Sequence, residues 1–313
     1  GGGRAAPAAS LGFGAMDSDV FAQLVVFAQQ VANGLANGMG YVLIAVGLTL
    51  VFGVLRIVNF AHGEFYMLGA YFTYYVTALA GIDYLGALVL ATLAVAAIGI
   101  VANQFFFRPL RKEHEFTILL SSLGLALLMA NGAEYVFGAD PKYVPTRYAD
   151  ETIEIGPVVV TQQRVLVIAV AFAMIAATYW FIRHTRMGKM MQATAQNPEG
   201  AQLTGINTGF VHAYTFAFAC GLAALSGALV GPTAMLTHTV GDWAVLKGFI
   251  VVVMGGLGSV TGALFGGILL GVAESLGGGY VSLGFKDAIG YAIIILVLLW
   301  RPQGLFSAGS GRR

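Results

Sequence analysis

The stretch from Leu85 to Phe107 contains no charged side chain and is almost entirely apolar. An α-helix needs about 20 mainly apolar residues to cross the hydrocarbon core of a bilayer. Only 10% of the 313 residues are charged, whereas a soluble domain carries about 25%. The sequence therefore predicts an all-α, polytopic membrane protein. The runs that we expect to span the membrane are residues 35–55, 65–79, 85–107, 116–137, 165–182, 212–230 and 288–300.

The two ends of the chain differ from its middle. Residues 1–15 have no helical period, so we interpret them as a linker or an addition ahead of a natural start at Met16. Residues 16–306 are expected to form a single transmembrane domain, and residues 307–313 a tail. The apolar segment from Phe21 to Val31 contains three glutamines, which favours a position at the membrane interface.

The distribution of charge predicts which loops share a side of the membrane. Basic residues cluster at 108–112 and at 183–189, and such clusters mark cytoplasmic loops. The acidic loop 138–164, in which alternating residues predict a small hairpin, then lies outside. Arg301 belongs inside only if the glycine-rich segment 247–276 breaks into two short passes, or one pass and a re-entrant piece. We therefore expect eight or nine spans, some of them discontinuous.

A short polar stretch interrupts the apolar chain between Arg56 and Glu64. It contains Asn59, His62 and Gly63 as well. A charged group stranded at the centre of a bilayer costs roughly 2.5–3.5 kcal/mol. The stretch must therefore turn at a membrane surface, or its polar groups must face a packed or watery interior.

The loop 187–206 has the residues of two capped helices. Asn197 is a suitable N-cap, Pro198 suits the first helical position, and Glu199 suits the first turn. Gly205 can end the second helix. Such a loop could be a rigid docking element for a cytoplasmic partner or an ordinary amphipathic connector, and the residues alone leave both interpretations open.

Three glycines, Gly258, Gly262 and Gly266, follow one another at intervals of four. On a helix this spacing places them on one face, where small residues allow close helix packing. The same glycine-rich run could also unwind and line a binding site, as broken helices do in transporters. We favour helix packing.

No catalytic or metal-binding pattern is recognisable in the sequence. The five histidines lack ligand spacing, no phosphate-binding loop is present, and no nucleophile–base grouping occurs. Glu134 and Glu274 lie in or near apolar segments, so each is a candidate functional carboxylate, but both are close enough to the ends of spans to reach the interface instead. The single cysteine, Cys220, excludes a disulfide framework, and the net charge of +1 argues against a nucleic-acid partner.

Several motifs together resemble the branched-chain amino acid ABC-transporter permeases of the LivH type. The two N-terminal ones are GLTLVFG at residues 47–53 and VNFAHGE at residues 58–64. The segment 192–206 resembles that family's cytoplasmic coupling loop, and residues 255–267 and 299–306 resemble its C-terminal half. With the two N-terminal motifs counted as one match, the four matches occur in the expected order, and the resemblance covers Phe21 to Phe306.

The resemblance implies the permease subunit of an ATP-driven importer in a bacterial inner membrane, without an ATPase or cofactor of its own. A second, LivM-like permease, two cytoplasmic subunits that bind ATP and Mg, and a periplasmic binding protein would be its partners. The substrate would be a branched-chain or other hydrophobic amino acid, carried by alternating access. Urea, short amides and aromatic or carboxylic acids are alternatives within the family, and a secondary transporter or channel is the alternative from another class.

The resemblance also gives the polar motifs expected roles. The loop with Gln196, Asn197, Pro198, Glu199 and Gly205 would couple the chain to the ATPase. The turn with Asn59, His62, Gly63 and Glu64 would shape the inward end of the path or its gate. Glu64 could bind substrate, or it could be a structural tie, hydrogen-bonded to a neighbouring span or paired with Arg56, and we favour the tie.

Overall fold

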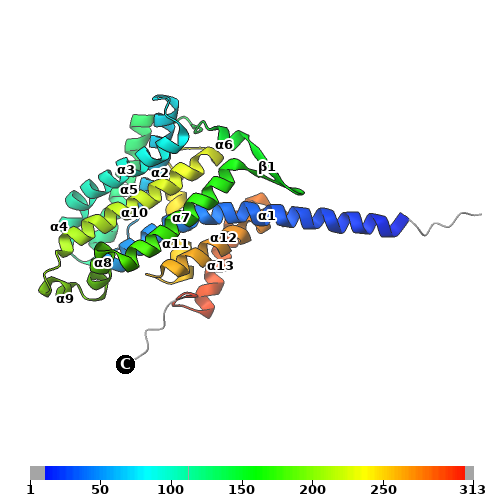
Figure 1. Cartoon of the computed structure of the whole chain (residues 1–313). Helices are drawn as coiled ribbons and strands as arrows, with labels where there is room; N and C mark the ends of the chain where they lie inside the picture. Colours follow the sequence, from blue (N-terminus) through cyan, green and yellow to red (C-terminus); the bar gives the residue numbers. More distant parts are fainter. Residues whose placement is uncertain (1–10, 112, 307–313) are drawn as a thin grey trace, which may run out of the picture.

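A computed structural model describes residues 11–111 and 113–306, and it is a bundle of helices with one small hairpin (Figure 1). Most of the expected linker and the whole expected tail therefore lie outside the described residues. The elements are α1 (Leu11–Leu50), a π-helical turn (Val51–Leu55), α2 (His62–Ala78), α3 (Tyr84–Ala102), α4 (Arg108–Leu110), α5 (Glu115–Phe137), α6 (Arg147–Asp150), β1 (Thr152–Ile155), β2 (Val158–Thr161), α7 (Gln162–His184), α8 (Arg186–Gln196), α9 (Pro198–Leu203), α10 (Thr208–Val230), α11 (Val240–Gly255), α12 (Val260–Tyr280) and α13 (Lys286–Trp300).

Six of the described helical stretches are long and apolar enough to cross a membrane. They correspond to α1 with its π-helical turn, to α3 with a second π-helical turn (Asn103–Phe107) and α4, and to α5, α7, α10 and α12. Three further apolar helices, α2, α11 and α13, are 17, 16 and 15 residues long. An α-helix rises about 1.5 Å per residue, so each of these three falls short of the roughly 30 Å hydrocarbon core if it stands alone. The all-α architecture is the one expected from the sequence.

α1 is the central helix, and its first part differs from the prediction. It runs without a break from Leu11 to Leu50, so Phe21–Val31 is a continuation of the first span and not a separate interfacial segment. Residues 11–15, which we expected to be linker, are likewise helical. In Figure 1 the N-terminal part of α1 projects from the bundle. The prediction of an interfacial position rests on the three glutamines of this segment. A helix can carry such polar side chains without ending where it extends beyond the bilayer.

Small residues let the buried part of α1 approach its neighbours closely. α1 packs along α12 and α10. A Cβ atom on Gly38 or on Gly271 would collide with backbone atoms of the opposite helix. Such contacts between backbones stabilise helix association in a bilayer, where burial from water supplies little driving force.

The glycine-rich segment breaks into two helices. The expectation that Arg301 lies on the inner side predicts this break. α11 ends at Gly255, and the chain turns through Gly256, which has a φ of +96° that glycine adopts without strain, before α12 begins at Val260. The first of the two helices begins at Val240, seven residues before the expected start at Lys247. The sequence prediction of a break was therefore correct.

The predicted hairpin forms and lies at the end of the bundle opposite to α8 and α9 (Figure 1). β1 and β2 pair antiparallel, with Thr152 opposite Thr161. The side-chain amide of Gln29 on α1 both donates to the carbonyl of Val159 (2.8 Å) and accepts from its N–H (3.0 Å). This contact fixes the hairpin alongside the projecting part of α1.

The opposite positions of the hairpin and of α8–α9 allow a direct test of sidedness. A cysteine introduced at the exposed position Glu154 should react with a membrane-impermeant thiol reagent in intact cells, and one at the exposed position Gln202 should react only after the membrane is opened. Cys220 is buried and should give little background. Labelling of Gln202→Cys but not of Glu154→Cys in intact cells would invert the topology predicted from the basic clusters.

Candidate functional site

The polar stretch before α2 lies inside the bundle. Asn59, His62 and Glu64 are buried, and a Cβ atom on Gly47 of α1 would touch both the His62 ring and the carbonyl oxygen of Ala219 on α10. Gly47 and Ala219 are interior positions of long buried helices. α2 therefore begins within the bundle, which agrees with the packed interior that the sequence left open as one of two alternatives, and the role of this turn in the transport path stays a prediction.

Side chains satisfy the backbone where the chain folds back toward the interior. After the π-turn, Arg56 adopts a left-handed conformation (φ +57°), and residues 57–59 have no regular structure. The N–H of Phe60 donates to Ser122 Oγ on α5 (3.2 Å), and that of Ala61 donates to Asn59 Oδ1 (3.0 Å). Irregular backbone at membrane depth is tolerated where protein groups satisfy it in this way.

The pairing of Glu64 with Arg56 is wrong. The Arg56 guanidinium donates to the carbonyl of Ala195 at the end of α8 (3.0 Å), away from Glu64. The Glu64 carboxylate lies against Gly241 in the first turn of α11, and a Cβ atom on Gly63 would also collide with the Gly241 carbonyl. The first turns of α2 and α11 thus meet inside the bundle. Glu64 Oε2 has no hydrogen-bond partner among the described residues, so packing against the first turn of α11 is the contact that the structure shows, and the role of Glu64 as a tie stays a prediction.

The loop 187–206 forms the two short capped helices that the sequence predicts. Asn197 Oδ1 accepts from the N–H of Gly200 (2.9 Å), Pro198 is the first residue of α9, and Glu199 is exposed in its first turn. Gly205 has a φ of +85° just after α9. Gln196 ends α8, and its carbonyl also faces Arg56. The side chain of Arg56 therefore connects the turn after α1 to the end of α8.

The three spaced glycines do not share one helical face. Gly258 lies in the turn between α11 and α12, with a φ of +84° and open space around it, so its assignment to helix packing is wrong. The helix starts only at Val260 because Ser259 is its N-cap. Gly262 and Gly266 are on α12. A Cβ atom on Gly262 would collide with the carbonyl of Gly255, and a Cβ atom on Gly266 would lie 3.0 Å from the carbonyl oxygen of Val251. These two positions bring α12 close to α11 of the same chain.

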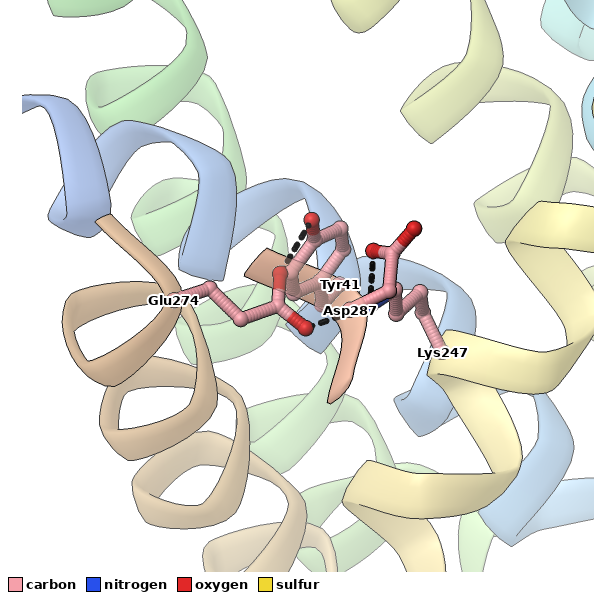
Figure 2. Close-up of polar contacts among 4 residues, drawn as sticks. All are labelled: Tyr41, Lys247, Glu274 and Asp287. Carbon is pink, nitrogen blue, oxygen red and sulfur yellow. Dashed lines mark hydrogen bonds and ion pairs between the residues drawn. The ribbon is translucent and has the colours of Figure 1, made fainter. Parts of the chain in front are cut away.

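Sequence reasoning missed a buried ionic cluster of four residues from four helices (Figure 2). Lys247 Nζ of α11 lies 2.5 Å from Glu274 Oε1 of α12 and 2.8 Å from Asp287 Oδ1 of α13. The hydroxyl of Tyr41 on α1 donates to Glu274 Oε2 (3.0 Å). The side chains of Lys247 and Glu274 are 0% exposed, whereas that of Asp287 is 51% exposed.

The ionic cluster ties the two short helices α11 and α13 to the central pair α1 and α12. Glu274 does not reach the interface as proposed from the sequence, because Lys247 and Tyr41 satisfy its carboxylate inside the bundle. The side chain of Glu134, in contrast, is 44% exposed, and its Oε2 lies 3.9 Å from Nε2 of His238. The signal that could have found the cluster is Lys247 itself, because a lysine in an apolar run needs a buried partner.

Two cavities accompany these polar groups. One of about 790 Å³ is lined by Arg56, His114 and Ala195, near the end of α8. The other, of about 290 Å³, is lined by Tyr41, Tyr66 and Trp243, among other residues, next to the ionic cluster. Among the described residues, no three His, Cys, Asp or Glu side chains are grouped so as to hold a metal ion. The geometry thus offers cavities and ties between helices, which suit a path that changes shape.

Comparison with known proteins decides the family. Residues 30–298 match the family model described as the permease component of branched-chain amino acid transport systems. The chain belongs to this family. It is 35% identical to the permease LivH of Salmonella typhimurium, over 90% of this chain and 96% of that protein. It is 33% identical to the permease BraD of Pseudomonas aeruginosa, over 89% of this chain and 95% of that protein.

A more distant relative and one solved structure are also similar. The probable permease LivH of Methanocaldococcus jannaschii is 26% identical over 84% of this chain and 87% of that protein. The structure of PsaBC from Streptococcus pneumoniae in complex with Fab covers 90% of this chain and 89% of its own, at 15% identity with a TM-score of 0.41. The family membership makes this chain a multi-pass membrane permease, in agreement with the resemblance found in its sequence.

Proposed function

We propose that this chain is the membrane-spanning permease subunit of an ATP-driven importer that takes up branched-chain amino acids. The observation that carries the proposal is the match to LivH, a high-affinity branched-chain amino acid permease, over 96% of its length. A periplasmic binding protein would deliver the substrate, and the chain would lie in a bacterial inner membrane beside a second permease. Two cytoplasmic ATPase subunits, which bind ATP and Mg, would supply the energy.

In this proposal the α8–α9 unit (residues 186–203) receives the motion of the ATPase. Its caps at Asn197 and Gly205 make it a compact body, and the exposed Glu199 offers a charge to a docked partner. Arg56 then connects the end of α8 to the turn between α1 and α2. A shift of α8 can therefore reach α2, whose first turn contacts α11. ATP binding would shift the population between two conformations, since a ligand acts only through its different affinity for each.

The proposal predicts ATP-dependent uptake of leucine. The chain would be reconstituted in proteoliposomes with its cognate permease, ATPase and binding-protein partners, with ATP on the ATPase side. We expect labelled leucine to accumulate, and to be competed by isoleucine and valine. Omitting ATP or the binding protein should abolish accumulation. Uptake without ATP would instead indicate a secondary transporter or channel, and uptake of urea or amides with no competition by leucine would contradict the proposed substrate.

A further inference from the structure

The cavity beside the ionic cluster has the position of a first substrate contact. Thr233 and Ala234, which line it, belong to the connection that follows α10. In the same connection, Leu236 forms backbone hydrogen bonds with Lys142, which lies in the loop between α5 and the hairpin. The cavity therefore lies toward the end of the bundle that carries the hairpin, away from α8–α9. In the proposed topology this is the outer half, into which a binding protein would release its ligand.

The walls of this cavity combine apolar and aromatic surfaces. Ile44, Val230, Val240 and Ala244 present small or branched apolar side chains. The rings of Tyr41 and Trp243 meet edge to face at 5.6 Å, and both line the cavity. Small-molecule pockets measure about 300–1,000 Å³, so a cavity of about 290 Å³ is sized for one small molecule with a short side chain.

Charge is arranged around the cavity in a way that suits a zwitterion. Lys286, at the start of α13, lines the cavity together with Asn37, and an ammonium and an amide are donors that a carboxylate binds. Two aromatic residues of the cavity wall also contact the ionic cluster, since the Tyr41 hydroxyl donates to Glu274 Oε2 (3.0 Å) and Lys247 Nζ lies 5.7 Å from the centroid of the Trp243 ring. Aromatic rings attract cations. Because Trp243 already has a cation beside it, the ring of Tyr41 is the aromatic surface that suits the ammonium of a bound ligand.

We propose that this cavity is a binding site for the transported amino acid. The branched apolar side chain lies against Ile44, Val230 and Val240, the carboxylate is bound by Lys286 and Asn37, and the ammonium faces the ring of Tyr41. The inference rests on the proposed function, because the cavity is assigned to the substrate of the importer. It adds the residues that recognise this substrate.

A cysteine-protection experiment tests occupancy of the cavity. Ala234→Cys places a thiol in the cavity wall, Cys220 is fully buried, and Ser282→Cys is an exposed control near the start of α13. In the reconstituted complex, an excess of leucine should slow the reaction of a small thiol reagent with Ala234→Cys several-fold and leave Ser282→Cys unchanged. Glycine, which lacks the apolar side chain, should protect less. Equal reaction rates at Ala234→Cys with and without leucine would overturn the proposal.

Transport kinetics test the assignment of Lys286. Hydrogen bonds to charged groups change affinity by roughly tenfold or more, so Lys286→Gln should raise the KM for leucine about tenfold with a smaller change in kcat. Lys286→Arg keeps the charge and should restore most of the affinity. Trp243→Ala widens the cavity and should shift the preference from leucine toward phenylalanine about tenfold.

The two proposals fail in different ways. If the unaltered complex takes up no amino acid, the proposed function itself is wrong. If the unaltered complex transports leucine and both Lys286→Gln and Trp243→Ala retain its KM and its preference, the proposed function stands and the substrate does not use this cavity. A Trp243→Ala complex that fails to assemble leaves the decision to Lys286→Gln and to the protection experiment, which place no large change in the core.

Discussion

Replacing Lys247 with methionine should destabilise the folded chain by about 3–5 kcal/mol. Methionine matches the length of the lysine stem but leaves Glu274 inside the bundle with only the Tyr41 hydroxyl as a partner. Asp287 should be affected less, since its side chain is 51% exposed and can be hydrated. The measurement is the thermal or denaturant unfolding of the purified chain in lipid nanodiscs, followed by tryptophan fluorescence.

A double variant separates charge burial from packing. Lys247→Met combined with Glu274→Gln removes both buried charges and keeps a group that can bond to Tyr41, so we expect it to recover most of the lost stability. Removing one partner of a buried ion pair is costly, whereas removing both is often close to neutral. If Lys247→Met alone unfolds like the parent, or if the double variant is no better than the single one, the ionic cluster does not tie these helices.

The spans were predictable from the sequence because the bilayer imposes a length and a composition. Leu85–Phe107 and Phe116–Phe137 needed only their apolar runs, and the break between α11 and α12 followed from the requirement that Arg301 lie inside. The caps of α9 were equally local, since Asn197, Pro198 and Gly205 act within a few residues of their own backbone. These features could be predicted because they depend on residues close by in the chain.

The interior start of α2 could not be deduced in this way. The residue types of the polar stretch before α2 are compatible with a surface turn and with a packed interior, because polar side chains can be hydrated at a surface or enclosed by neighbouring helices. Ser122, which accepts from Phe60, and Gly47, which makes room for His62, decide between them, and neither is marked by a pattern in the sequence. The choice depends on tertiary contacts that only the fold reveals.

The ionic cluster shows a similar limit. The sequence shows that Lys247 needs a partner, but several acidic residues are available in or near apolar segments, Glu134 among them. Glu274 is the partner because α11 and α12 pack together, with Gly262 and Gly266 allowing close approach. The spacing of the glycines did indicate this contact, although Gly258 was wrongly included. Packing thus determines which charges can pair.

The ionic cluster, the first turns of α2 and α11, and Arg56 connect the two ends of the bundle. Trp243 of α11 lines the small cavity, Gly241 of the same helix contacts the first turn of α2, and the segment before α2 begins at Arg56. Arg56 in turn contacts α8. A change at the α8–α9 unit therefore has a continuous series of contacts to the cavity. A change at Arg56 tests whether transport uses this series.

Replacing Arg56 with glutamine should lower transport per ATP hydrolysed roughly tenfold or more, because hydrogen bonds from a charged donor contribute about 1.5–3 kcal/mol. The substitution removes the bond to the Ala195 carbonyl at the end of α8, where a positive charge also complements the helix dipole. ATP hydrolysis should continue, since the chain has no recognisable ATPase motif and the altered side chain lies in the permease. Leucine uptake and phosphate release would be measured on the same proteoliposomes.

Two further variants distinguish the side chain of Arg56 from its backbone. Arg56 is the one non-glycine residue with a positive φ among the described residues, so Arg56→Gly relieves strain while it removes the same hydrogen bond. If the bond couples transport to hydrolysis, Arg56→Gly should be uncoupled as strongly as Arg56→Gln. Arg183→Gln, at an exposed position in the last turn of α7 and outside the α8–α9 unit, is the matched loss of charge and should transport normally. Normal transport by both Arg56 variants would show that motion of α8 reaches the cavity by another route.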